Sequence, residues 1–406
     1  MENTIELKQQ LTITTSQAVA KPAAAARSRM AYIDTLRVVL TIIVIMVHAA
    51  VTYGSVGDWF YKDPVSNDLT GAVLSLFVVY SQAFFMGLFF FVSGYFTPGS
   101  IDRKGQLSFW KDRLLRLGLP MVVFTLLLVK IAIYIREAND GMTLSFWKFS
   151  TTNFWRSADS GPTWFLFALL VFSAAYSLWR LVGKRLVRSA VTSPRRLLPA
   201  PSTKVLLGFA LVMAVSMLAT SQVTPIGRFD KLFGAISLQY AFFPQYIMMF
   251  TAGILAYRNN WLAQWDGRKL RTWSLVSLGL ILVFPVIFFL GGAAEGKFDA
   301  FASGIQWQSI TLNLWIGLAC VAFSMTLVLW LRDRKRQPSR LMSAISANQF
   351  AVYILHTLVL VPVTIWMSAY AIDPLVKFFL ASALTLVACN IIAEILRRIP
   401  GLKVVL

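Results

Sequence analysis

The chain has 406 residues, of which 57% are hydrophobic and only 14% are charged, and its formal net charge is +20. The low charged fraction excludes an ordinary soluble domain, in which about 25% of residues are charged. Apolar runs of about 20 residues recur along the chain, so we expect membrane-spanning helices rather than the alternating pattern of an outer-membrane barrel.

The chain divides into two short tails and one membrane domain. Residues 1–30 are polar and alanine-rich and predict a disordered cytoplasmic tail without a cleaved signal peptide. Residues 31–397 predict one transmembrane domain, and residues 398–406 a short cytoplasmic tail. We predict ten spans, near residues 36–54, 70–96, 118–135, 162–181, 205–222, 233–257, 272–292, 309–331, 344–369 and 374–396.

The distribution of positive charge orients these spans. If the first span runs outward, about three quarters of the 38 Lys and Arg residues fall in segments on the inner side. This is the pattern of the positive-inside rule. We therefore expect an all-α integral membrane protein, a polytopic bundle of about ten transmembrane helices with both termini cytoplasmic. The rule also explains the net charge, so we expect membrane lipids as partners and no nucleic acid.

The first span carries two polar residues on one helical face. Arg37 and His48 are 11 residues apart, which is about three turns and about 16 Å of rise. Asp34 can pair with Arg37 along the same face. Ionisable residues inside a membrane are rare and mark functional sites, which makes His48 a candidate for proton transfer. The alternatives are a snorkelling arginine and a histidine bonded to a neighbouring helix.

Two further arginines follow the second span. Arg113 and Arg116 are three residues apart, so we expect them on one helical face at the cytoplasmic surface, beside Arg37. Three guanidiniums would form a phosphate-binding patch. A positive-inside loop explains the same arginines without any ligand.

The other histidine of the chain, His356, lies in the ninth span, at a depth similar to His48. Tyr353 and Asn348 are available as its hydrogen-bonding partners, and a structural role is as well supported as a functional one. Two histidines without nearby carboxylates cannot build a metal site, so we expect no metal.

Five segments together resemble the acyltransferase 3 family of bacterial inner-membrane proteins. They are YIDTLR at 32–37 followed by His48, FFFVSGYF at 89–96, R-x-x-R-x-x-x-P from Arg113 to Pro120, PTWFL at 162–166 and SANQFAVYILH at 346–356. The resemblance covers about residues 30–396. FFVSGYF followed by the basic motif is similar to the glucan biosynthesis protein C branch of this family. The chain departs from many members at Val38, which replaces a glycine, and at Asp112, which replaces an arginine.

The resemblance implies O-acyl transfer from a cytoplasmic acyl-CoA to a hydroxyl of a carbohydrate or glucan outside the inner membrane. It implies that Arg37, Arg113 and Arg116 bind the donor and that His48 is catalytic, with no permanently bound cofactor. FFFVSGYF would line the inner half of a channel, in which Gly94 allows close approach and Ser93 and Tyr95 offer hydrogen bonds.

Two other classes of function remain open from the sequence. The first is a polytopic transporter or flippase for a lipid-linked or acylated substrate, which ten spans permit. Transporters often have broken helices and coupling carboxylates near the midplane, and neither is evident in the sequence. The second is a membrane scaffold or sensor, which would leave the two histidines unexplained.

Overall fold

The computed structural model describes residues 31–152, 154–186, 197–292, 295, 297–334 and 339–405. Within these ranges the chain is helical apart from loops and one antiparallel hairpin of β1 (Asp230–Leu232) and β2 (Ile236–Leu238). Eight helical stretches are long and apolar enough to cross a membrane: Ala31–Thr52, Asp68–Asn139, Gly161–Gly183, Thr203–Ser221, Arg268–Leu290, Trp307–Asp333, Arg340–Ser368 and Pro374–Leu396. The prediction of a polytopic helical membrane protein is confirmed. The predicted N-terminal tail, residues 1–30, lies outside the described residues.

The stretch Asp68–Asn139 has 72 residues and contains more than one crossing. As a straight helix it would be over 100 Å long, whereas the hydrocarbon layer is about 30 Å thick. Two predicted spans, 70–96 and 118–135, fall within it. Its elements are α2 (Asp68–Gln82), α3 (Phe85–Arg113), η1 (Leu114–Gly118), α4 (Leu119–Val123), η2 (Phe124–Leu128) and α5 (Val129–Asn139).

The remaining predicted spans correspond to single helices. The long helices in the rest of the chain are α7 (Trp164–Leu186), α8 (Thr203–Ser221), α9 (Phe243–Arg258), α11 (Arg268–Leu290), α13 (Trp307–Asp333), α14 (Arg340–Ser368) and α15 (Pro374–Leu396). The short helical elements are α6 (Phe146–Thr152), η3 (Gly161–Thr163), η5 (Tyr240–Phe242), α10 (Trp261–Gln264), α12 (Asp299–Ala302) and α16 (Leu402–Val405). The predicted span 233–257 differs most, since it begins in the hairpin and α9 itself has only 16 residues.

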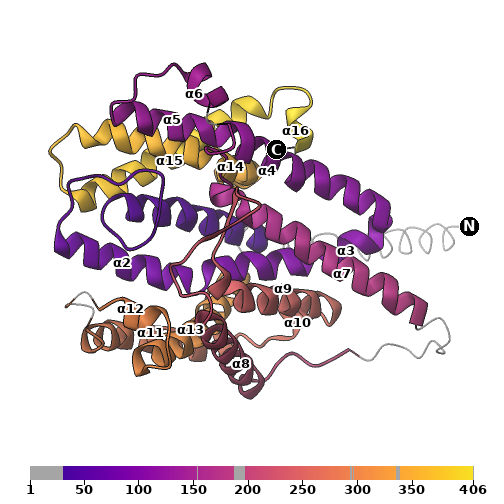
Figure 1. Ribbon diagram of the computed structural model, residues 1–406. Helices are drawn as coiled ribbons and strands as arrows, with labels where there is room; N and C mark the ends of the chain where they lie inside the picture. The colour runs from indigo at the N-terminus through magenta and orange to yellow at the C-terminus, as the bar shows by residue number, and fades with distance from the viewer. Residues whose placement is uncertain are drawn as a thin grey trace, which may run out of the picture.

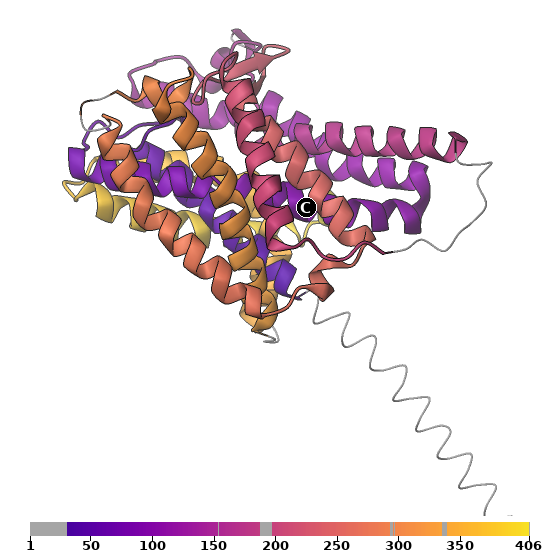
Figure 2. The ribbon, with the colours of Figure 1, turned by 90° about the horizontal axis from the view of Figure 1, so that it is seen from below.

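The long helices form a bundle with two sides. Figure 1 shows α14, α15 and α5 together on one side, and α8, α11 and α13 on the other. Among the elements from α2 to α16, the pair of α3 and α9 makes the most extensive contact. Beyond the bundle, α3 continues as a helical arm that turns back at Gly105 (φ 74°, ψ 168°), a conformation that favours glycine. Figure 2 shows this arm projecting beside α7.

Helix α3 packs directly against the backbone of α9. A Cβ atom on Gly94 would lie 2.1 Å from the carbonyl oxygen of Phe250, and one on Gly253 would lie 2.0 Å from that of Phe91. Small residues at such contacts let membrane helices approach closely. The close approach that Gly94 permits in this structure is therefore that of the neighbouring helix α9.

The second predicted span is broken near its middle. Helix α2 ends at Gln82 and α3 begins at Phe85, because Phe84 adopts non-helical angles (φ −138°, ψ −31°). The side-chain Nε2 of Gln245 on α9 donates to the carbonyl of Ala83 at 2.5 Å. A broken helix is tolerated inside a membrane where neighbouring helices satisfy the freed backbone groups.

One carboxylate joins three helices at the end of the bundle that the charge distribution assigns to the cytoplasm. Asp102 on α3 pairs with Arg180 of α7 at 2.7 Å and with Arg258 of α9 at 2.6 Å. Arg258 also donates to the hydroxyl of Tyr176 at 2.8 Å. This network holds the base of the arm against the bundle.

Candidate active site

His48 lies one helical turn before Thr52, where the first helix ends, and its ring is partly exposed. The loop that follows brings Trp59 back over it. The imidazole and indole rings stack with their centroids 3.8 Å apart and an angle of 15° between their planes. Trp59 therefore fixes the orientation of the His48 ring from a loop outside the helix.

His356 lies beside this stack and is fully buried in α14. Its ring is parallel to that of His48 within 13°, with the centroids 5.4 Å apart. Nδ1 of His356 is 2.6 Å from the carbonyl oxygen of Tyr353. Because a carbonyl only accepts hydrogen bonds, this contact places the proton of the neutral ring on Nδ1 and leaves a lone pair on Nε2. Nε2 is buried and has no hydrogen-bond partner among the described residues.

The two expected hydrogen-bonding partners of His356, Tyr353 and Asn348, make different contacts. Tyr353 bonds it through the backbone carbonyl, while the Tyr353 hydroxyl donates to the carbonyl of Pro162 at the start of α7. Asn348 lies away from the ring and accepts a hydrogen bond from Arg397 at 2.7 Å, which joins α14 to the end of α15. The prediction that Asn348 is a partner of His356 is therefore wrong.

A polar cavity of about 760 Å³ opens over the His48–Trp59 stack. The loop after the first helix, α5, the segment around η3 and the β1–β2 hairpin form its walls. Three acidic and three basic side chains line it: Asp58, Glu137, Asp159, Arg136, Arg156 and Lys231. The cavity thus reaches His48 from the end of the first helix opposite to Arg37.

Ion pairs hold part of this polar wall. Lys231 on β1 lies 2.9 Å from the carboxylate of Asp159, and Arg136 pairs with Glu137 on α5. Asp159 also accepts a hydrogen bond from the backbone N–H of Gly161 at 2.7 Å. In the described residues no ion-pair partner is present for Arg156 or Asp58, so these two charges are available to a ligand in the cavity.

The loop that carries Trp59 is anchored by a buried ion pair. Asp63 and Lys377 of α15 are 0% and 1% exposed, with the carboxylate and ammonium 3.0 Å apart. Tyr61 in the same loop is hydrogen-bonded to the side chain of Ser368. Burial raises the pKa of its phenol, so the hydroxyl is protonated at neutral pH. The position of Trp59 over His48 thus depends on α14 and α15.

A second buried lysine holds the opposite wall. Lys130, at the start of α5, is 2% exposed and donates to the carbonyls of Ser150 and Phe154 at 3.3 and 3.0 Å. Its ammonium also lies 3.6 Å from the ring centroid of Phe154. Lys130 fixes the loop from which Arg156 extends into the cavity.

The arginine cluster lies at the other end of the first helix. Arg37 is 3.7 Å from Asp34, and its guanidinium lies 4.9 Å from the ring centroid of Phe96. Arg113 donates to Thr97 Oγ1 at 2.9 Å and is close enough to Arg37 for their charges to repel. Two neighbouring guanidiniums without an acidic group shared between them can bind an anion.

Arg116 does not join this cluster in the predicted way. It lies in η1, a π-helix, and its side chain is exposed, whereas Arg113 is half-buried. A π-helix has more residues per turn than an α-helix, so residues three apart no longer share a face. The expected common face of Arg113 and Arg116 is therefore wrong.

The FFFVSGYF segment lies between the two ends. Ser93 is partly exposed, and its carbonyl accepts a hydrogen bond from Thr97 at 2.7 Å. Tyr95 packs edge-on against Phe96 and Tyr257, with centroids 5.4 and 5.5 Å away. The residues that line the cavity at His48 include neither Arg37 nor these residues.

Sequence reasoning missed Trp59, Lys130 and the Asp63–Lys377 pair. The two lysines carried a signal, because a lysine near a span end that is not exposed needs a partner. Trp59 carried none, since tryptophans are common at membrane interfaces.

Taken together, the fold and this site define a polytopic membrane protein with an ionisable pair inside the bundle, a polar cavity on one side of it and an arginine cluster on the other. A family model described as an acyltransferase domain matches residues 30–394. The chain therefore belongs to the acyltransferase 3 family of membrane acyltransferases, and it is an enzyme of that class.

The chain is also similar over nearly its whole length to curated relatives. It is 26% identical over 385 residues to the glucans biosynthesis protein C of Salmonella agona, covering 92% of this chain and 93% of that protein. It is 27% identical over 388 residues to the same protein of Salmonella enteritidis, with coverage of 92% and 93%. No solved structure matches the chain.

Proposed function

We propose that this acyltransferase moves an acyl group from a cytoplasmic acyl-CoA to a hydroxyl of a carbohydrate, such as a glucan, on the outer side of a bacterial inner membrane. The observation that carries the proposal is the polar cavity of about 760 Å³ with the His48 ring in its wall. The cavity is large enough for a sugar, since ligand pockets are typically about 300–1,000 Å³. The names of the relatives support a glucan as the acceptor.

In this proposal His48 acts as the general base. It takes the proton of the acceptor hydroxyl as the oxygen attacks the thioester carbonyl. The new C–O ester bond forms, the C–S bond breaks, and the proton returns from His48 to the departing thiolate. General base catalysis contributes about 10²–10⁴ in rate. In the covalent alternative, a nitrogen of His48 attacks the thioester, the C–N bond forms as the C–S bond breaks, and the thiolate takes the imidazole proton. The acceptor oxygen then attacks the acyl-His48, the C–O bond forms as the C–N bond breaks, and the hydroxyl proton passes to the leaving imidazole.

Trp59 and His356 support His48 in different ways. The imidazolium that forms during the reaction lies over the indole face, where a cation is stabilised by the ring. His356 is fixed by Tyr353 and packs beside His48, so we assign it a positioning role.

Arg37 and Arg113 would bind the donor phosphates at the inner end of the first helix. The rise from Arg37 to His48 is about 16 Å, so an elongated donor held at the arginines can extend its thioester toward the base. The cavity at His48 is not lined by Arg37 or by residues 89–96, so in this proposal the donor passes the FFFVSGYF segment to reach His48.

The direct test is release of CoA by the purified protein supplied with acyl-CoA and a soluble glucan. His48→Ala should reduce turnover by at least about 100-fold, because the base is lost. Lys148→Ala, a change at an exposed side chain outside the cavity, is the control and should leave turnover unchanged. A thermal unfolding temperature equal to that of the wild type shows that the fold of each variant is intact. Turnover by His48→Ala within a few fold of the wild type would refute the assignment.

One structural feature favours the alternative of a transporter. The break between α2 and α3 at Ala83 and Phe84 resembles the discontinuous helices of transporters, which the sequence did not indicate. Membership of an acyltransferase family favours chemistry instead. Proteoliposomes separate the two: transport would deliver unmodified substrate without thioester consumption, whereas an acyltransferase releases one CoA for each ester formed.

A further inference from the structure

A second cavity, unrelated to the histidines, opens on the side of the bundle formed by α8, α9 and α13. Its volume is about 350 Å³, and 18 residues line it. Apart from two indoles, the only polar side chains among them are those of Thr251 and Ser324. None of the residues assigned to donor binding or catalysis contributes to it. We refer to it as the apolar groove.

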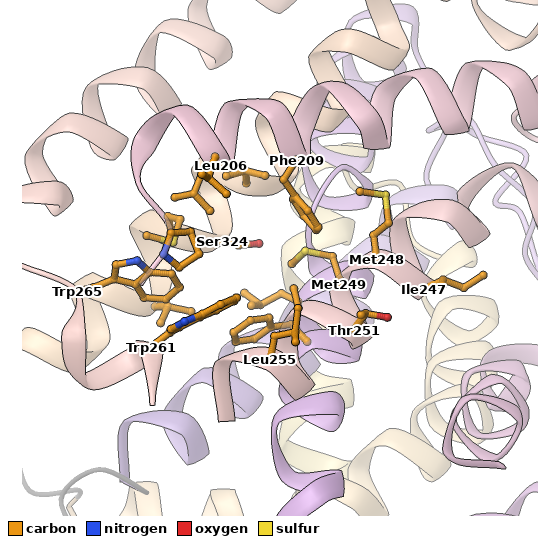
Figure 3. Close-up of a pocket in the computed structure, with 18 residues that line it drawn as sticks. Leu206, Phe209, Ile247, Met248, Met249, Thr251, Leu255, Trp261, Trp265 and Ser324 are labelled. Atoms are coloured by element: carbon orange, nitrogen blue, oxygen red, sulfur yellow. The ribbon is translucent and has the colours of Figure 1, made fainter. Parts of the chain in front are cut away.

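The apolar groove is elongated along α9. Ile247 lies at one end and Leu255 eight residues further on, which corresponds to about 12 Å along the helix. Figure 3 shows Trp261 and Trp265 closing the end opposite to Ile247, with Leu206 and Phe209 of α8 along one wall. A long, narrow and almost entirely apolar space fits an alkyl chain better than a compact or polar ligand.

The tryptophan end of the groove offers an unused hydrogen-bond donor. Trp265 is 8% exposed, and its buried Nε1 has no hydrogen-bond partner among the described residues. Trp261, by contrast, donates through its Nε1 to the carbonyl of Leu198 at 3.2 Å. A buried N–H without a partner is costly, so a ligand that supplies an oxygen there gains affinity.

The rim at this end is strongly basic. Lys269 donates to the carbonyl of Pro201, a residue of the groove, at 3.1 Å, and Lys204 adjoins Val205 of the groove. Helices α8 and α11 both begin here, and the N-terminus of a helix favours anions. Arg332 also lies at this end, since it donates to the carbonyls of Leu262 and Trp265 at 2.9 and 3.0 Å.

We propose that the apolar groove binds one chain of an anionic glycerophospholipid of the phosphatidylglycerol type. The acyl chain fills the groove toward Ile247, the ester carbonyl accepts a hydrogen bond from Trp265 Nε1, and the phosphate lies at Lys204 and Lys269. Basic pockets between membrane helices on the cytoplasmic side are suited to such headgroups. The tail of an acyl donor is a poorer fit, because a chain lying here would hold its thioester away from His48.

The experiment is native mass spectrometry of the purified full-length protein, incubated with phosphatidylglycerol or phosphatidylcholine carrying the same oleoyl chains. The wild type should retain one molecule of phosphatidylglycerol in preference to phosphatidylcholine. Lys204→Gln and Lys269→Gln should each reduce this preference roughly fivefold. Equal retention of both lipids by the wild type, or a preference unchanged in the double variant, would overturn the headgroup assignment and with it the proposal.

Filling the groove provides an independent arm. Leu206→Trp combined with Thr251→Trp should abolish retention of phosphatidylglycerol. Val212→Trp is the matched control, because Val212 is on the same helix α8, is 57% exposed and does not line the groove. Retention of the lipid by the filled variant would overturn the proposal. Loss of bound lipid in the Val212→Trp control would do the same, since the effect would then not be specific to the groove.

The indole contact and the identity of the chain have their own readouts. Trp265→Phe replaces the indole by a phenyl ring and so removes the N–H group. It should therefore weaken binding of the ester lipid but not of the ether analogue, which lacks the carbonyl. Displacement of phosphatidylglycerol by an equal concentration of palmitoyl-CoA would show that the groove holds the donor chain instead, and would contradict the proposal. None of these measurements depends on acyl transfer, so their failure is distinguishable from a failure of the proposed function.

Discussion

At the scale of single residues, the site depends on three nearly parallel rings. His48 is held against Trp59 at 3.8 Å and against His356 at 5.4 Å, and His356 is in turn fixed by the carbonyl of Tyr353. An imidazole has few ways to be oriented inside an apolar bundle, because hydrogen-bonding partners are scarce there. Stacking on Trp59 orients the His48 ring without occupying its nitrogens.

Removing the indole should slow the chemical step rather than weaken substrate binding. Trp59→Ala eliminates the face that stabilises the protonated His48 ring, an interaction worth about 1–2 kcal/mol, so we expect kcat to fall about tenfold. Trp59→Phe should lose less, because an aromatic face remains. Steady-state kinetics of CoA release measure both values.

The control is Trp366→Ala, since Trp366 is 57% exposed on α14 and far along that helix from His356. Its kcat should match the wild type. A Trp59→Ala enzyme with an unchanged kcat would mean that the stack has no part in catalysis.

The candidate residues themselves were largely visible in the sequence, but their contacts were not. The sequence placed the two histidines at a similar depth in two apolar spans and left the role of His356 open, and the structure brings their rings together. The third ring could not be predicted, since Trp59 reaches His48 through a loop whose path depends on the Asp63–Lys377 pair. Contacts that depend on tertiary packing leave no local pattern.

At the scale of elements, a π-helix after Arg113 changes the local geometry at Arg116. The arm formed by α3 and η1 turns Arg113 toward Arg37 and leaves Arg116 exposed. The sequence predicted a helical face from the spacing of three, which holds for an α-helix alone. The turn at Gly105 could not be predicted either, because a single glycine in a polar segment does not distinguish a loop from a helical hairpin.

The two arginines should therefore respond differently to the same substitution. Arg113→Lys should raise the KM for acyl-CoA about tenfold, because lysine cannot replace a bidentate guanidinium at a phosphate. Arg116→Lys, three residues away, is the matched control and should change the KM less than twofold. Titration of the donor at saturating glucan gives both values. A larger effect at Arg116 than at Arg113 would show that the donor binds on the exposed face of the arm.

The buried ion pair of Asp63 and Lys377 ties the outer loop to α15 and should matter for stability. Lys377→Met leaves the carboxylate buried without its partner, which typically costs about 3–5 kcal/mol. We expect the free energy of unfolding in detergent to fall by that amount. Replacing both partners, as in Asp63→Leu with Lys377→Met, should recover part of the loss.

Lys148→Met, at an exposed lysine, serves as the control for charge removal alone and should be neutral within about 0.5 kcal/mol. Equal stability of Lys148→Met and Lys377→Met would mean that the ion pair does not hold the loop.

At the scale of the whole molecule, two different polar sites lie at opposite ends of the first helix. The first helix carries Arg37 at one end, among basic groups, and His48 at the other, under a polar cavity. The apolar segments predicted the helical class, because membrane-spanning helices need long apolar runs. The break at Ala83 and the backbone contact of Gly94 with α9 were beyond prediction, since they depend on which helices become neighbours.

The central claim is that the acyl group passes from a donor on the arginine side to an acceptor on the His48 side. Proteoliposomes with acyl-CoA trapped inside and glucan outside, with the protein oriented by its natural insertion, test this most directly. We expect acylated glucan in the external medium, CoA retained in the lumen, and neither product with His48→Ala. Acylation that occurs only when donor and acceptor share a compartment, or that persists in His48→Ala, would contradict it.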